Sequence, residues 1–233
     1  SEMPDGQWRT CHPSGIPTVF DADHDRADDL MLDYLDFFAI LRGRDGDFIL
    51  PPQTTPIVPN QWKLAYNSFI PVATDRNSSP SFFVPLGYGG VGLLDADFKS
   101  ERWMHHLGYD TPPKAGMIDV DGDGRIEVGY EVRPTGSFVC RDLLSGEEEW
   151  KVELPGRGYG PCVSADLDGD GKGEFLMGNV CLGTDDQGQG TIRWTSSVPV
   201  AGTPVIADVM GGGDAELIVT SSGGRIVVLG HAP

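Results

Sequence analysis

The sequence lacks long apolar runs, an excess of positive charge and the short motifs of phosphate-binding, dinucleotide-binding or serine-hydrolase sites. No segment is apolar over the ~20 residues that a membrane-spanning helix needs, so we expect no membrane insertion. Lysine and arginine number 17 against 35 aspartates and glutamates, which gives a formal net charge of −18. Because such a surface repels phosphate backbones, we expect no nucleic-acid partner.

Cysteine is also scarce. The chain contains no CxxC pair and no histidine at the spacing of a zinc site, which argues against structural zinc. We interpret the cysteines as buried thiols. The alternative, if the protein is exported, is a disulfide between Cys162 and Cys181, which flank one predicted hairpin. The four cysteines are Cys11, Cys140, Cys162 and Cys181.

Acidic loops are abundant, and one of them, DVDGDGRIE, begins at Asp119 with acids at positions 1, 3, 5 and 9. The calcium loop of a helical EF-hand needs a glutamate at position 12 and a helix on each side. Position 12 is Tyr130 here, and it is Met177 in the sister loop DLDGDGKGE that begins at Asp166. Short apolar runs of strand type flank both loops. Each loop is therefore predicted to join two strands.

The loop recurs along the chain. DADHDRADD keeps all four acids, DVMGGGDAE loses the middle pair, and DRNSSPSFF keeps only the first. The separations between first aspartates are 54, 44, 47 and 42 residues, a period typical of propeller blades. Each of the five tryptophans precedes one of these aspartates by 13 to 16 residues. The pairs are Trp8 and Asp21, Trp62 and Asp75, Trp103 and Asp119, Trp150 and Asp166, and Trp194 and Asp208.

Each unit therefore consists of a strand, an acidic turn, two further strands and an outer strand with the tryptophan, whose ring covers the core between neighbouring sheets. This makes one four-stranded antiparallel blade. We predict an all-β protein, a single β-propeller domain over residues 1–233 with five four-stranded blades. The N-terminal strand is expected to complete the last blade and close the ring, although a piece cut from a longer ring would show the same phase. The predicted blades span 16–65, 70–107, 115–154, 161–198 and 203–230 plus 6–11.

In these loops the sequence resembles the FG-GAP/VCBS repeats of integrin-type β-propellers, whose blades carry a D-x-D-x-D-G-x-x-D/E loop between the first two strands. The resemblance covers roughly residues 8–230 and is strongest in the third and fourth units. Such propellers serve adhesion receptors, polysaccharide lyases, lectins and bacterial surface proteins. The resemblance implies an extracellular or cell-surface protein.

The four acids of a loop, with the carbonyl at position 7, would make an oxygen shell that suits Ca²⁺ better than Mg²⁺. We expect two or three calcium sites. The alternative is a set of solvated acidic turns without metal. The predicted ligands are Asp21, Asp23, Asp25 and Asp29; Asp119, Asp121, Asp123 and Glu127; and Asp166, Asp168, Asp170 and Glu174, with the main-chain oxygens of Ala27, Arg125 and Lys172.

A ligand face is predicted opposite the calcium loops, where loops between blades carry aromatic rings beside hydrogen-bonding groups, a combination that suits a sugar. The predicted contacts are Asn67, Tyr88, Tyr109, Arg157 and Tyr159. The favoured function is a non-catalytic module that binds a glycan or a protein, with flanking domains in a larger polypeptide.

The alternative function is a polysaccharide lyase acting on uronate-containing polysaccharide, which we favour over a glycosidase if the protein is an enzyme. A lyase needs a base, an acid and a cation that neutralises the uronate carboxylate. The candidate catalytic residues are His12, His106, Tyr109, Arg157 and Tyr159, with Lys114 as a second cation. The plainer interpretation places His106 on a sheet surface and makes Arg157 and Tyr159 part of a turn.

Overall fold

The structure is a computed structural model, and its regular secondary structure is entirely β-strand in the residues that it describes. The chain divides into two compact units, Ser1–Pro113 and Lys114–Pro233, each with its own sheets. None of the described residues forms a helix that is long and apolar enough to span a membrane. The described residues are 18–34, 37–54, 70–72, 81–86, 90–95, 100–108, 114–156, 160–198, 200, 202–211, 215–221 and 223–230.

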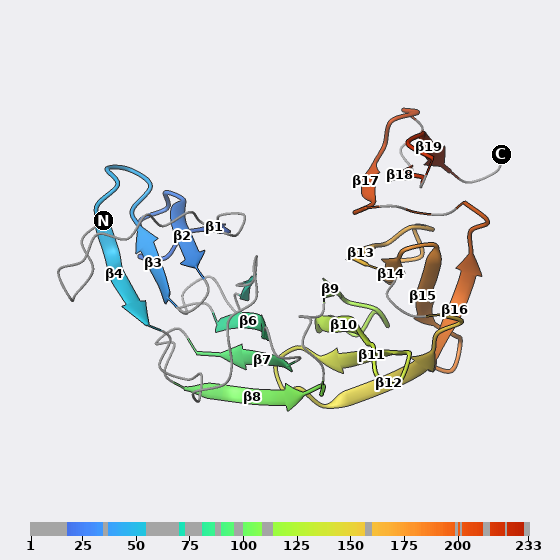
Figure 1. The fold of residues 1–233 in the computed structure, drawn as a ribbon, viewed down its shortest axis with the longest axis horizontal. Coiled ribbons are helices and arrows are strands. Elements are labelled where there is room, and N and C mark those ends of the chain that lie inside the picture. Colours follow the sequence, from blue (N-terminus) through green and yellow to red (C-terminus); the bar gives the residue numbers. More distant parts are fainter. Residues whose placement is uncertain are drawn as a thin grey trace. The chain divides into compact units, whose positions relative to one another are not determined.

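The first unit contains two four-stranded antiparallel sheets, here named I and II, in which neighbouring strands follow chain order (Figure 1). Sheet I comprises β1 (Thr18–Phe20), β2 (Asp29–Tyr34), β3 (Phe37–Leu41) and β4 (Phe48–Thr54). Sheet II comprises β5 (Ile70–Val72), β6 (Ser81–Leu86), β7 (Gly90–Leu94) and β8 (Glu101–His106).

The second unit contains three antiparallel sheets whose neighbouring strands also follow chain order, named III, IV and V. Sheet III comprises β9 (Gly116–Ile118), β10 (Glu127–Val132), β11 (Ser137–Asp142) and β12 (Glu148–Glu153). Sheet IV comprises β13 (Cys162–Ala165), β14 (Glu174–Met177), β15 (Val180–Thr184) and β16 (Gly190–Thr195). Sheet V comprises β17 (Val205–Ala207), β18 (Glu216–Thr220) and β19 (Ile226–Leu229).

Within each unit the sheets pack face to face through alternating side chains, as the period of two along a strand requires. In the first unit Met31 and Ile40 of sheet I share a core with Phe82 and Val84 of sheet II. In the second unit sheet IV is buried on both faces. Phe175 and Met177 of β14 pack toward sheet III, whereas Leu176 between them packs toward sheet V.

The prediction of five antiparallel blades is confirmed for four four-stranded sheets, while sheet V has three strands in the described residues. Residues 6–11, predicted to complete sheet V, lie outside the described residues, so ring closure stays a prediction. The outer strand carries the tryptophan in sheets II, III and IV. In sheet I the fourth described strand is β4, which precedes Trp62; Trp62 lies outside the described residues, so its place on an outer strand stays a prediction. A tight turn joins β3 directly to β4 and is closed by the hydrogen bond from Gly46 N–H to the Arg42 carbonyl (2.8 Å).

The described cysteines, Cys140, Cys162 and Cys181, are free and buried. Cys162 lies on β13 and Cys181 on β15, with β14 hydrogen-bonded between them. Two strand spacings amount to about 9.5 Å, which exceeds the Cα separation that a disulfide can bridge. The alternative of a Cys162–Cys181 disulfide is therefore wrong.

Candidate metal centre

Four turns join the first two strands of sheets I, III, IV and V, and each holds its ninth residue in the same way. That residue is an acid, begins the second strand, and is at most 8% exposed. One of its carboxylate oxygens accepts the N–H of the second loop residue, which ties the acid to the start of its own turn. The pairs are Ala22 to Asp29 at 2.9 Å, and Val120 to Glu127, Leu167 to Glu174 and Val209 to Glu216 at 2.8 Å each.

The first aspartate of a loop accepts N–H groups from the turn that follows it. Asp119 accepts from Gly122 at 2.7 Å and from Gly124 at 2.9 Å, and the loop of sheet IV repeats both bonds. Both glycines have positive φ, 81° and 86°, which a residue with a Cβ adopts only at a cost. In sheet I the matching residues are His24 (φ 62°) and Arg26 (φ 70°), so that loop keeps the same curl without glycine.

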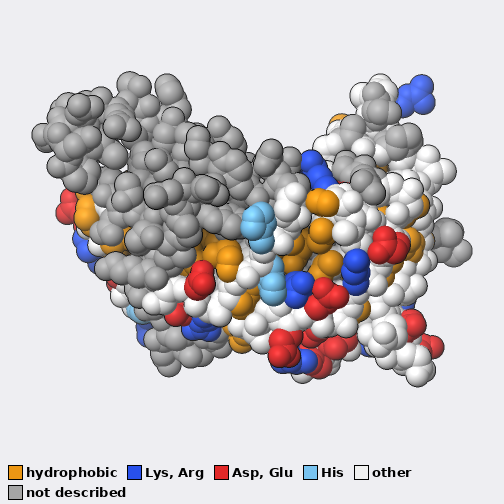
Figure 2. Space-filling view, turned by 60° about the horizontal axis from the view of Figure 1, so that its bottom comes forward, with side chains coloured by type: hydrophobic (Ala, Val, Ile, Leu, Met, Phe, Trp, Pro, Cys, Tyr) orange, Lys and Arg blue, Asp and Glu red, His pale blue; other side chains and the backbone are white. Residues whose placement is uncertain are grey.

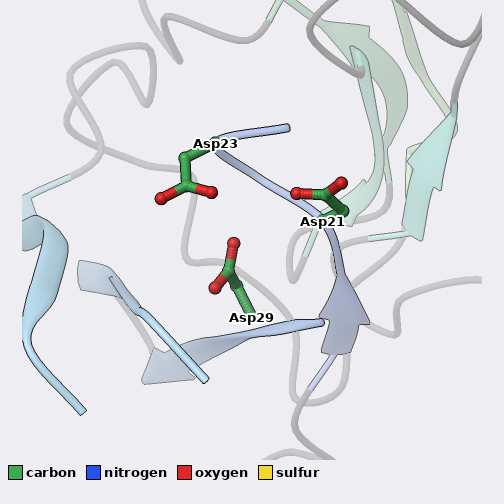
Figure 3. A group of neighbouring side chains, drawn as sticks. All are labelled: Asp21, Asp23 and Asp29. Carbon is green, nitrogen blue, oxygen red and sulfur yellow. The ribbon is translucent and has the colours of Figure 1, made fainter. Parts of the chain in front are cut away.

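In three of the loops the acids at positions 1, 3 and 9 converge. Figure 3 shows Asp21 and Asp23 in the turn after β1 and Asp29 at the start of β2, with their carboxylates directed toward a shared space. In each loop one oxygen from each of the three acids lies within 4.8 Å of the others, and these groups could hold a metal ion. The three groups are Asp21, Asp23 and Asp29; Asp119, Asp121 and Glu127; and Asp166, Asp168 and Glu174.

The fifth-position acids, Asp25, Asp123 and Asp170, lie outside these groups of three and close their own turns. One oxygen of each accepts the N–H of the seventh loop residue at 2.8 Å, a local bond typical of aspartate in turns. The other oxygen of Asp25 lies 3.1 Å from Arg44 Nη2, and that of Asp123 lies 2.6 Å from Arg125 Nη2. Their role as calcium ligands stays a prediction.

Burial and mutual repulsion make these loops electrostatically unfavourable without a cation. Burial, with smaller contributions from the neighbouring acids Glu149, Asp121 and Asp119, raises the pKa of Glu127 to about 8. Burial likewise raises the pKa of Glu174 to about 7. A bound cation would remove the cost of ionising these side chains.

Two of the acidic loops have an arginine beside them that was not predicted from the sequence as part of the metal site. Arg42 Nε lies 3.3 Å from Asp23 Oδ2 in sheet I, and Arg193 Nη2 lies 3.0 Å from Asp168 Oδ2 in sheet IV. Strand register could have indicated both, since Arg42 follows β3 opposite the start of β2 and Arg193 precedes the outer-strand tryptophan. Figure 2 shows basic side chains interspersed with acidic ones on the described part of one face.

The loop of sheet V agrees with its weaker motif. The loop of sheet V keeps Asp208 and the buried Glu216, and Gly211 N–H donates to Asp208 Oδ1 at 2.6 Å. Its described residues form no acidic group of three. The loop that begins at Asp75 lies outside the described residues.

Most of the predicted ligand-contacting and catalytic residues also lie outside the described residues: His12, Asn67, Tyr88, Tyr109, Arg157 and Tyr159. His106 is described and lies exposed at the end of β8, where its Nδ1 accepts the N–H of Gly108 at 3.0 Å. Lys114 is exposed.

A cavity of about 500 Å³ opens between sheets IV and V, and the sequence reasoning did not anticipate it. It combines apolar side chains with charged groups of the sheet IV loop. Its lining consists of Leu167, Asp168, Glu174, Arg193, Trp194, Ser196, Ala215, Leu217, Leu229 and Gly230.

Comparison with known proteins supports the fold. The sequence matches no protein-family model and no curated protein. Among solved structures, it is similar to Saccharomyces cerevisiae Sqt1, with a TM-score of 0.63 and 11% identity over 94% of this chain and 59% of that one. The exotype rhamnogalacturonan lyase YesX gives a TM-score of 0.58 and 14% identity over 100% of this chain and 51% of that one.

The V. cholerae biofilm matrix protein Bap1 gives a TM-score of 0.54 and 18% identity over 77% of this chain and 33% of that one. The chain thus spans between a third and three fifths of these three structures. At such identities the likeness shows a shared β-propeller-like fold.

Proposed function

We propose that this protein is a calcium-stabilised β-propeller domain that binds a ligand, with carbohydrate as the expected ligand class. The observation that carries the proposal is the threefold repetition of one arrangement, in which acids at positions 1, 3 and 9 bring oxygens within 4.8 Å of one another. Three independent turns of different sequence share this geometry, together with the hydrogen bonds that the second and sixth loop residues donate to the ninth and first acids. A purely solvated acidic turn gives no reason for such convergence.

Calcium suits these loops better than other metals because every side-chain donor is a carboxylate oxygen. Each loop carries at least four acids in a turn of nine residues, so their repulsion opposes folding of the metal-free hairpin. A site loaded at about a hundred times its dissociation constant adds roughly 2.7 kcal/mol to the free energy of unfolding. The ion in these sites is therefore structural, and ligand recognition belongs to another part of the domain.

The ligand face is proposed at the opposite end of the sheets. Because neighbouring strands are antiparallel, the β9–β10 loop and the β12–β13 connection leave sheet III at opposite ends. Arg157 and Tyr159 belong to that connection. The fold likeness to a biofilm matrix protein and to a rhamnogalacturonan lyase supports a glycan ligand and an extracellular or cell-surface location. A protein ligand would use the same loops, and the domain would act within a larger polypeptide.

Calcium stabilisation is tested by thermal unfolding with calcium, with magnesium and with excess chelator. We expect calcium to raise the Tm well above the value in chelator, and magnesium to raise it less. The triple variant D21N/D119N/D166N should lose this increment, whereas D186N, in an exposed turn of sheet IV, should keep it. An unchanged Tm on chelation of the wild-type protein would contradict the proposal.

A polysaccharide lyase is the second candidate, because the likeness to the rhamnogalacturonan lyase covers the whole of this chain. The two functions separate in one pair of assays: a glycan array, and a measurement of unsaturated uronate products on pectin- and ulvan-type substrates. Binding without product supports the binding module. Product that disappears in variants of His12, His106 or Tyr159 supports the lyase.

A further inference from the structure

Sheet III differs from sheets I and IV in the charges that surround its ninth-position acid. The sheet I and sheet IV loops each have an arginine from another part of the same sheet, Arg42 after β3 or Arg193 of β16, paired with the third-position aspartate. Arg193 precedes the outer-strand tryptophan of sheet IV, and the residue at that place in sheet III is Glu149. Opposite Glu127 on β11 lies another acid, Asp142. Sheet III therefore has Glu149 and Asp142 where sheet IV has Arg193 and Gly183.

Only one of the two carboxylate oxygens of Glu127 has a hydrogen-bond partner in the described residues. The residue is 0% exposed, and its Oε2 accepts the N–H of Val120 at 2.8 Å. Its Oε1 is buried and has no hydrogen-bond partner in the described residues. In sheet I both oxygens of the matching Asp29 accept a backbone N–H, from Ala22 and from Gly43. A buried carboxylate oxygen without a partner is costly, which indicates that a group absent from the protein chain faces Glu127.

Glu127 belongs to a second acidic group besides that of its own loop. Oxygens of Glu127, Asp142 and Glu149 lie within 4.8 Å of one another. Since calcium binds oxygens at about 2.3–2.6 Å, oxygens that share one ion lie no more than about 5 Å apart. Asp142 Oδ1 accepts the N–H groups of Leu144 and Ser145, and Asp142 Oδ2 accepts a long hydrogen bond from Arg125 Nη1 at 3.3 Å.

Arg125 neutralises this second group only in part. Its guanidinium is bound tightly to Asp123, at 2.6 and 2.7 Å, and reaches Asp142 Oδ2 at 3.3 Å. Its distance to Glu149 Oε1 is 3.8 Å, beyond a hydrogen bond. One guanidinium thus faces the carboxylates of both groups, and most of the negative charge remains without a counter-ion.

We propose that sheet III binds a second divalent cation, of the calcium type, between Glu127, Asp142 and Glu149, and that Glu127 bridges this ion to the one in the 119–127 loop. The inference rests on the proposed calcium occupancy of that loop. The three ligands stand at the start of β10, the end of β11 and near the start of β12. The second ion therefore connects the ends of three strands of the sheet. The loop ion connects only the turn between β9 and β10 to the start of β10.

The test is the number of ions bound per chain, measured by equilibrium dialysis against calcium with metal analysis. D142N/E149Q removes two ligands of the second group alone, and D119N/D121N removes two ligands of the loop group alone. E147Q/E148Q is the control: it removes two negative charges at the start of β12 without changing either group. We expect D142N/E149Q to bind one ion fewer than wild type, and E147Q/E148Q to bind the wild-type number. E149R, which copies the arginine of sheet IV, should also lose one ion, and it replaces the double variant if that one fails to fold.

The outcomes separate this inference from the proposed function. If D142N/E149Q and E149R bind as many ions as wild type while D119N/D121N binds fewer, the second site is refuted and the loop site stands. If wild type binds no calcium at all, both are refuted. A loss of one ion in D142N/E149Q, with the circular dichroism spectrum unchanged, supports the second site.

Discussion

The two faces of sheet IV bury apolar side chains in different ways. Toward sheet III the core is aromatic: Phe138, Trp150 and Phe175 contact one another with ring centroids 5.2–6.1 Å apart. Toward sheet V the core is aliphatic, with Leu176 and Cys181 packed against Leu217 and Val219. The same strand, β14, supplies side chains to both cores.

The outer-strand tryptophans explain the difference between the two cores. Trp150 of sheet III is 6% exposed and lies over Gly190, at the start of the fourth strand of sheet IV, where an added Cβ would come within 2.2 Å of the indole. Trp194 of sheet IV is 41% exposed and lines the cavity of about 500 Å³. The described part of sheet V has no fourth strand. A tryptophan on one sheet is thus covered by the fourth strand of the next.

Truncation of the two tryptophans should give the largest contrast. Trp150→Ala removes a ring from a closed aromatic core and should lower the free energy of unfolding by about 3–5 kcal/mol. Trp194→Ala removes a ring that is partly in water already and should lower it by about 1–2 kcal/mol. Denaturant unfolding of both variants in saturating calcium measures the difference.

Equal losses of unfolding free energy in Trp150→Ala and Trp194→Ala would contradict the difference between the two faces, because they would mean that Trp194 is covered in solution. A fourth strand made by residues 6–11, as predicted from the sequence, would do this. In that case removal of residues 1–11 should lower the stability of the wild-type chain and reduce the effect of Trp194→Ala to about 1–2 kcal/mol.

The sequence predicted the sheets well because their signals are local. The strands flanking the Asp119 loop and the Asp166 loop follow from short apolar runs beside acidic turns, and β9–β12 lie within the predicted range 115–154. The phase of Trp103, Trp150 and Trp194 correctly marked outer strands. The phase did not indicate β4, the fourth described strand of sheet I, which follows the tight Arg42–Asp47 turn, and Trp62 lies outside the described residues.

The candidate site was predictable only in part. Spacing within a loop brought together positions 1, 3 and 9, but the turn hydrogen bonds formed by Asp25 or Asp123 depend on where each oxygen points. The partners Arg42 and Asp142 come from another strand of the same sheet, so they depend on register. Register is set by packing of whole faces and cannot be read from one short motif.

Adding a methyl group beneath Trp150 should give an intermediate effect. Gly190→Ala places a Cβ 2.2 Å from the indole, so the ring or the strand must move, at a cost of about 1–3 kcal/mol. Gly183→Ala is the matched control on the adjacent strand, where the nearest atom would be Cγ of Arg193 at 3.4 Å. We expect the control to change the free energy of unfolding by less than about 0.5 kcal/mol. If neither variant changes the free energy of unfolding in denaturant, Trp150 does not pack closely against Gly190 between sheets III and IV.

The smallest expected effect concerns Cys162 and Cys181, which report on the two faces of sheet IV separately. Burial raises the pKa of the Cys162 thiol to about 12, and it also raises the pKa of Cys181. An unfolded thiol has a pKa of about 8.5, so above that pH the unfolded chain releases a proton that the folded chain keeps. The stability contribution of each thiol is complete below pH 8.5 and is lost as pH rises, by at most about 1.4 kcal/mol per pH unit.

Thiol labelling under native conditions should therefore be slow for both cysteines and should differ between the faces. In single-cysteine chains, Cys181 is expected to react faster than Cys162, because the interface of sheet IV with sheet V is closed by three described strands and borders a cavity, while the other is sealed by Trp150. Raising the pH from 7 to 9 should speed both reactions. Trp150→Ala should accelerate Cys162 alone, since that ring covers only its face. Identical rates for the two cysteines, before and after this substitution, would mean that sheet IV opens only by unfolding of the whole unit and that its two faces are equally secure.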